Sequence, residues 1–219
     1  MIHDDDLDDE VLWTKKSIFF ELPYWKDNKL RHNLDVMHIE KNVCDNILGT
    51  ILNVDKKSRD DANVRKALEE VGVKPHLWLQ PSAGRDSIMP VAPYSMSLDE
   101  KDRFLKVLQK LRVPDGYGSN ISRCVNMKQR RLLNLKSHDN HVLMQDILPV
   151  ALQASHVTEV IDLLSDLSSF FKYVCSPTLD AYELEQVQSR LVLTLCEMEK
   201  EFPPTFFYNH GPSRNSFGR

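Results

Sequence analysis

The sequence is poor in glycine, in cysteine and in long hydrophobic runs, and each shortage excludes a class of protein. Its 219 residues contain 7 glycines, too few to favour phosphate-binding loops built from glycine. The longest apolar run, Ile147 to Leu152, is six residues, whereas a membrane-spanning helix needs about 20. Four scattered cysteines without a CxxC motif do not make a disulfide scaffold. We therefore expect a reduced intracellular protein without a membrane segment.

The first ten residues contain no Lys or Arg and carry six acids. A secretory signal begins with positive charge and continues with an apolar stretch, so none is expected here. Low hydrophobicity with high charge is typical of disorder. We interpret residues 1–14 as a disordered acidic leader.

Hydrophobic residues make up 42% of the chain and charged residues 27%, as in ordinary globular proteins, which excludes a fibrous or mostly disordered chain. The charge is uneven: residues 101–136 carry ten basic side chains against two acids, and residues 137–210 carry three against eleven. The basic segment either pairs with the acidic one or meets nucleic acid. The sequence leaves both alternatives open.

Hydrophobic residues recur mostly at three- and four-residue steps, which predicts a mainly α protein. A short strand is expected at residues 17–22, ended by Pro23. Capping residues and glycines help to set the helix limits, with Ser97-x-x-Glu100 as a capping box and Gly72 as a stop. The predicted helices span residues 33–53, 55–71, 97–111, 138–153, 156–175 and 180–201. The first of them has Asn33 or Asp35 as its N-cap, and Gly49 is expected to weaken it or to end it near there.

Glu40 is the sharpest anomaly in the first of these helices. At 100° per residue it falls inside the apolar face, between Val36 and Cys44, while Asp35 and His38 lie on a polar stripe. A buried carboxylate is costly and is retained for an ion-pair partner, a metal or proton chemistry. The alternatives are a Glu bonded to a Lys or Arg from elsewhere, or one at the edge of the face.

His138 and His141 place two imidazoles three residues apart, where they could share a metal ion on a helix. The alternative is a cluster that caps the helix, since no further ligand is identifiable. No phosphate loop, dinucleotide fingerprint or nucleophile elbow is present, and no pattern supports Cys–His catalysis. We interpret the aromatic run at residues 202–208 as core or hydrophobic anchor rather than a base-stacking platform.

Three stretches closely resemble plant CACTA-type (En/Spm-like) transposases. Residues 15–53, with LRHNLDVMHIEKN, resemble the end of the transposase domain, and residues 113–126 and 135–150 resemble the next stretch of that family. Residues 159–207, ending LTLCEMEKEFPPTFF, resemble the uncharacterised helical domain that comes after it. The resemblance covers about 190 of the 219 residues in the same order.

The resemblance implies a ribonuclease H-like core in which three carboxylates hold two Mg²⁺ or Mn²⁺ ions for DNA cleavage and transfer. The third acid of such a core lies on a helix packed against the sheet. Glu40 is the matching candidate, Asp35 is the second choice, and His38 lies nearby. Glu40 is therefore also the candidate metal ligand.

The family's first two acids belong to a stretch that the resemblance does not cover. We therefore expect no enzyme activity from this chain alone, no bound cofactor and no small-molecule substrate. We expect four parts, of which the leader is the first. Residues 15–134 are expected to form a remnant of the catalytic core, one short strand and its helix, together with a loop-rich linker. A helical domain at 135–208 and a divergent tail at 209–219 are expected after it.

The family acts on DNA, which makes DNA the first candidate partner and a longer transposase relative the second. The candidate DNA contacts lie in the basic segment: Arg123, Lys128, Arg130 and Arg131. A transposase works in the nucleus, so a nuclear location is expected if the gene is expressed. The alternative function is a DNA- or protein-binding helical module retained by the host.

Overall fold

A computed structural model describes residues 18–27, 35–82, 84, 87–114, 120–154 and 158–207. The expected leader at 1–14, the N-cap Asn33 and the tail at 209–219 lie outside these residues. The chain divides into two units, residues 1–35 and 36–219. The described residues are mainly helical, as the sequence predicts.

In the first unit, the 3₁₀ helix η1 (Ile18–Glu21) lies where the strand was predicted, and a second 3₁₀ helix, η2 (Trp25–Asp27), comes after it. The prediction of a strand at 17–22 is therefore wrong for these residues. A strand needs a neighbour to hydrogen-bond with, and the backbone here closes a local turn instead, from the Trp25 amide to the Leu22 carbonyl at 3.0 Å.

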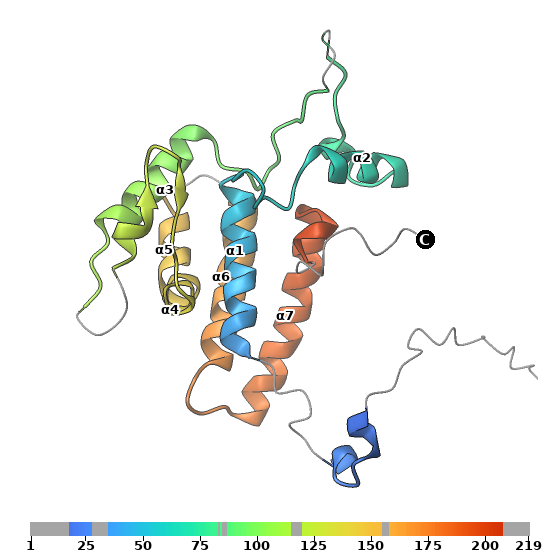
Figure 1. Cartoon of the computed structure of the whole chain (residues 1–219), viewed down its shortest axis with the longest axis vertical. Helices are drawn as coiled ribbons and strands as arrows, with labels where there is room; N and C mark the ends of the chain where they lie inside the picture. The colour runs from blue at the N-terminus through green and yellow to red at the C-terminus, as the bar shows by residue number, and fades with distance from the viewer. Residues whose placement is uncertain are drawn as a thin grey trace, which may run out of the picture. The chain divides into compact units, whose positions relative to one another are not determined.

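The second unit is built on helices, shown in Figure 1. The central α1 (Val36–Ile51) packs against α4 (Ser137–Val142), and α6 (Thr158–Val174) packs against α7 (Ala181–Glu201). The other helices are α2 (Ala62–Val71), η3 (Pro75–Leu77), α3 (Leu98–Lys110), η4 (Ile121–Cys124), the π-helix η5 (Leu143–Ile147), α5 (Leu148–Leu152) and η6 (Pro204–Phe206). Among the described residues, no helix is both long and apolar enough to cross a membrane.

One hydrophobic core runs from Cys44 in α1 to Phe206 after α7. It contains residues from both sides of position 134/135, where the sequence suggested a boundary between two parts. The apolar face of α1 is thus covered by helices of the same unit and needs no sheet.

Gly49 lies inside α1, which ends two residues later at Ile51, close to where the sequence predicts. A Cβ atom at this position would lie 2.5 Å from the backbone oxygen of Lys57. Glycine is therefore needed for close approach of the returning chain.

The helix predicted at 55–71 begins later, at Ala62, because the Asp61 side chain caps it by accepting hydrogen bonds from the amides of Asn63 and Val64. Residues 55–57 form a turn, in which Lys56 takes a left-handed conformation. The predicted stop at Gly72, with a φ of 78°, and the capping box at Ser97 and Glu100 are confirmed.

The helix predicted at 138–153 is a chain of three segments, α4, η5 and α5, rather than one regular helix. Pro149 has no amide hydrogen to donate to the carbonyl of Gln145, so the regular pattern fails there, next to the π-helix. Such π segments are frequent at functional sites.

A two-stranded antiparallel hairpin precedes α4. Strands β1 (Val125–Asn126) and β2 (Arg131–Leu132) pair Val125 with Leu132 and Asn126 with Arg131. The hairpin packs on α3 through β1. Three of the four candidate DNA contacts, Lys128, Arg130 and Arg131, lie within this hairpin, and Arg123 lies two residues before it.

Candidate functional site

Glu40 is fully buried, as its position in the apolar face predicts. Its neighbours Cys44, Ile47 and Ile51 on α1 are also fully buried, so Glu40 lies in the middle of the covered face and not at its edge. A carboxylate in such a place needs compensating partners.

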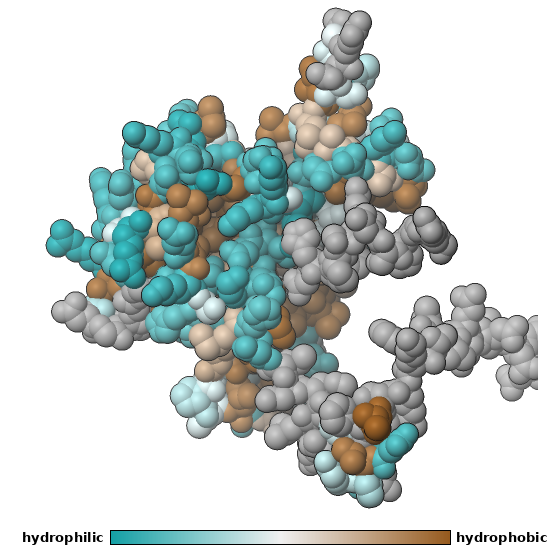
Figure 2. All heavy atoms as spheres, in the orientation of Figure 1, coloured by the Kyte–Doolittle hydropathy of each residue, from teal (hydrophilic) through white to brown (hydrophobic). Residues whose placement is uncertain are grey.

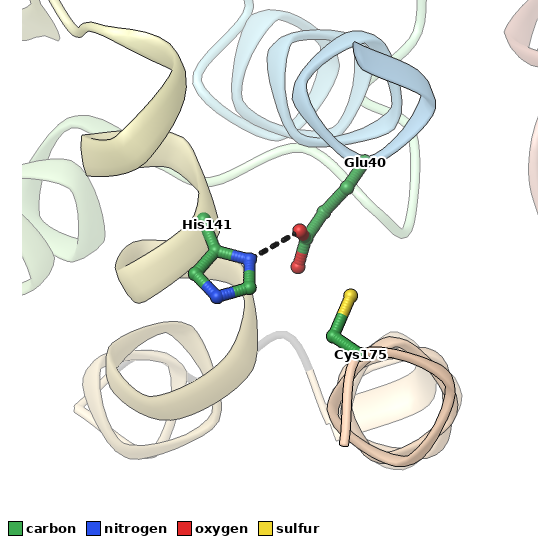
Figure 3. Close-up of side chains that lie close together, drawn as sticks. All are labelled: Glu40, His141 and Cys175. Atoms are coloured by element: carbon green, nitrogen blue, oxygen red, sulfur yellow. Dashed lines mark hydrogen bonds and ion pairs between the residues drawn. The ribbon is translucent and has the colours of Figure 1, made fainter. Parts of the chain in front are cut away.

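His141, from α4, supplies the first partner. Its Nδ1 lies 2.7 Å from Oε2 of Glu40, and 28% of its side chain remains exposed. Cys175 lies just after α6 and completes a group whose ligand atoms are all within 4.8 Å of one another. Figure 3 shows the three side chains converging from three separate elements.

Gln145, in the π-helix, is the fourth polar side chain of the group. Its Nε2 lies 3.1 Å from His141 Nδ1 and donates to the carbonyl of Phe171 at 3.3 Å. Gln145 therefore ties the end of α6 to the imidazole.

Two aspects of the site leave polar atoms unsatisfied among the described residues. The second carboxylate oxygen of Glu40, Oε1, is buried and has no hydrogen-bond partner. In addition, His141 Nδ1 faces both an acceptor, Glu40 Oε2, and a donor, Gln145 Nε2, and one nitrogen cannot donate to the first while accepting from the second.

The cluster does not have the electrostatics of a nucleophilic cysteine. Burial and the negative charge of Glu40 raise the pKa of the Cys175 thiol. A reactive cysteine needs the opposite, a lowered pKa beside a positive group.

The other candidate catalytic residues are not brought to Glu40. Asp35, one residue before α1, and His38, in its first turn, are both exposed. His138 is exposed and His141 contacts Glu40, and the metal pair of these two histidines stays a prediction. Their ring centroids are 6.2 Å apart. His141 contacts Glu40 because α1 packs against α4. The three-residue spacing of the two histidines in the sequence cannot reveal that packing.

Sequence reasoning missed Cys175 and Gln145. Both lie on helices that the hydrophobic periodicity predicts, but neither stands in a recognisable metal-binding spacing. The one signal in the sequence was Glu40 on an apolar helix face. Lys41 is the single cationic residue in the same helix turn, so a buried Glu40 implies partners from elsewhere in the chain.

The four candidate DNA contacts have different environments. Arg130 makes a two-pronged pair with Asp102 of α3, at 2.8 and 3.1 Å, and its hydrogen bonds lower the pKa of Asp102. Arg131 donates a hydrogen bond to the side-chain oxygen of Gln129 at 2.9 Å. Arg123 and Lys128 are exposed. Arg130 therefore anchors the hairpin, and the other three are available to a ligand.

Basic side chains line a hollow of about 430 Å³ beside the hairpin: Lys101, Lys128, Arg130 and Arg131. Asp55 is the acidic residue in the same lining. Burial and the positive charge of Arg130 lower the pKa of Lys101. Figure 2 shows hydrophilic residues over much of this side of the molecule, between patches of hydrophobic ones. The hollow offers positive charge to an anion.

The structure also bears on the alternative that residues 101–136 neutralise the acidic segment after them. Within the described part of the chain, the side chains of this basic segment form an ion pair only with Asp102, inside the segment itself. Its positive charge is not consumed by direct pairing with residues 137–207.

No family model matches this chain, and no match to it is found among the curated proteins or the solved structures.

Proposed function

We propose that this chain is a transposase-derived protein whose helical unit binds DNA through the hairpin surface and does not cleave DNA by itself. The hairpin surface is defined as Arg123, Lys128, Arg131 and Lys101. The observation that carries the proposal is that Lys101, Lys128 and Arg131 line one hollow beside the hairpin. Arg123 is exposed just before β1. Among the described residues, none of the four forms an ion pair with the acidic segment.

The sequence supports the transposase origin. The run LRHNLDVMHIEKN and the stretches after it resemble the En/Spm-like family in order and over most of the chain. On this proposal α1 descends from the helix that carries the third acid of a ribonuclease H-like core. Its place of action is then the nucleus, and a longer transposase relative is its candidate partner.

Electrostatics supports DNA as the ligand. A duplex carries one negative charge per about 1.7 Å of its axis, so a protein gains affinity by placing several Lys or Arg side chains along it. Arg123 lies before β1 and Lys128 in the turn of the hairpin, with Arg131 in β2. A hairpin with basic residues along its length suits contact with the phosphate backbone.

The lack of cleavage follows from the surroundings of Glu40. Two-metal cleavage needs several carboxylates around ions that also touch the scissile phosphate. Within the described residues, the group around Glu40 holds one carboxylate, one imidazole and one thiol. Glu40 is fully buried, so a DNA phosphate cannot reach it without unpacking α1.

The test of DNA binding is charge reversal on the hairpin. Replacing Arg123, Lys128 and Arg131 together by Glu is expected to weaken binding to a random-sequence duplex and to reduce the slope of log K against log salt by about 3, roughly one per phosphate contact. Fluorescence anisotropy over a salt series measures both. A matched control reverses three exposed lysines elsewhere, Lys66, Lys172 and Lys200, with the same change in net charge. Equal losses in the two triple variants would remove the hairpin from the proposal.

The test of cleavage uses the same protein with a duplex carrying the terminal repeats of an En/Spm-like element, in Mg²⁺ or Mn²⁺. We expect no nicking above the buffer control on a denaturing gel. Nicking by the purified chain that the Glu40→Gln variant abolishes would overturn this part of the proposal.

A further inference from the structure

We propose that Glu40, His141 and Cys175 form a binding site for a zinc ion that joins α1, α4 and the end of α6. This site is separate from the hairpin surface and from the two-metal chemistry of the En/Spm-like family. It rests on the convergence of three ligand types from three elements, with one buried carboxylate oxygen unpartnered among the described residues (Figure 3).

The geometry is close to that of a bound ion. Zinc lies at about 2.0–2.3 Å from imidazole, carboxylate and thiolate ligands in a tetrahedral arrangement, which puts pairs of ligand atoms about 3.3–3.8 Å apart. The three ligand atoms here lie within 4.8 Å of one another, and the closest described pair, His141 Nδ1 and Glu40 Oε2, is 2.7 Å apart. Side-chain movements of about 1 Å or less, within the range of rotamer adjustment, convert one arrangement into the other.

A cation resolves the hydrogen-bonding conflict at the site. All three ligand atoms present lone pairs once His141 is neutral at Nδ1 and Cys175 is a thiolate. The ion then binds one oxygen of the buried Glu40 carboxylate, whose Oε1 otherwise has no partner among the described residues. The Nδ1 lone pair then belongs to the ion, so Gln145 gives up its contact with His141 and keeps its bond to the Phe171 carbonyl beside the ligands.

The ligand set selects the metal. Magnesium and calcium prefer oxygen ligands, so an imidazole and a thiolate argue against them. One nitrogen, one oxygen and one sulfur suit zinc, which accepts each of these ligands. Three protein ligands leave a fourth position, and the partial exposure of His141 and Cys175 lets water reach it.

The experiment uses the full 219-residue chain, stripped of metal with a chelator and titrated with Co²⁺, which reports zinc-type sites by absorption. We expect one Co²⁺ per chain, visible tetrahedral bands, a thiolate-to-cobalt charge-transfer band, and displacement of all bands by Zn²⁺. Zn²⁺ is also expected to raise the melting temperature, because an ion bound only by the folded state stabilises it.

Cys175→Ser is the decisive variant. It should abolish the charge-transfer band and weaken zinc binding by more than about tenfold, since even partners of the ligands contribute about 10–100-fold. Cys196→Ser, which changes an exposed thiol on α7, is the matched control and should keep both. Circular dichroism checks that each variant has the helix content of the unchanged protein. The proposal is overturned if the wild-type protein shows no charge-transfer band, or if the band survives in Cys175→Ser. It is also overturned if both serine variants lose the band and zinc affinity equally.

Discussion

Replacing Asp60 by alanine is expected to destabilise the second unit by about 3–5 kcal/mol, as is typical when one member of a buried ion pair is removed. Asp60 receives hydrogen bonds from Arg65 at 2.8 and 2.7 Å and from the hydroxyl of Tyr94 at 2.7 Å. The side chains of Arg65 and Asp60 are 3% and 5% exposed. The variant would leave a buried guanidinium without its counter-charge and a phenol without its acceptor. Urea unfolding measures the loss.

Two controls separate the orphaned charge from a simple loss of contacts. Asp166→Ala breaks an ion pair with Arg190, whose side chain is 72% exposed, and should cost about 1 kcal/mol or less. The double variant Asp60→Ala with Arg65→Met removes both buried charges and should recover much of the stability. If Asp60→Ala costs no more than Asp166→Ala, the buried pair does not contribute in this way.

The environment of the network also affects the pKa values of Tyr94 and Arg65. Burial raises the pKa of the Tyr94 hydroxyl, and the negative charge of Asp60 raises it further, so the phenol remains a donor. Burial alone would lower the pKa of Arg65, but the hydrogen bond and charge of Asp60 raise it overall. The guanidinium of Arg65 and the hydroxyl of Tyr94 therefore both keep their protons at neutral pH.

Local patterns predicted the helices well because hydrophobic spacing and capping residues act within a few turns. The burial of Glu40 followed from one angle on a helical wheel, and the start of α3 followed from Ser97 and Glu100. The partner of Glu40 did not follow, because His141 is 101 residues away and is positioned by tertiary packing. The sequence alone was thus enough to identify Glu40, the first ligand of the candidate zinc site. The other two ligands could be identified only from the structure.

The errors have local causes as well. A charged stretch at residues 55–61 resembles the surface of a helix, but Asp61 caps the helix that comes after it, and Lys56 and Asn53 adopt left-handed conformations that a helix excludes. Charge counting likewise identified a basic segment, but it could not tell that Arg130 is committed to Asp102. Side chains with the same charge differ in availability only through their neighbours.

Replacing Phe202 by alanine is the second change with a large expected effect, about 3–5 kcal/mol, the usual cost of truncating a buried aromatic ring. Phe202 lies just after α7 and is fully buried. Its ring stacks on Tyr94, with centroids 5.0 Å apart, and on Phe206 at 4.2 Å. The burial of Phe202 and Phe206 confirms that these two residues of the aromatic run belong to the core. Urea unfolding followed by circular dichroism measures the cost.

Phe207→Ala is the matched control, since Phe207 is 39% exposed and should cost about 1 kcal/mol or less. Equal costs for the two alanine variants would contradict the anchoring role of Phe202.

The number of unfolding transitions gives a second result. Phe202 joins the end of α7 to Tyr94, and the carbonyl of Phe202 accepts a bond from Lys74 at 2.9 Å. Because one core spans both sides of position 134/135, we expect Phe202→Ala to shift a single transition rather than split it. Two separate transitions would instead mean that residues 135–208 fold independently of α1.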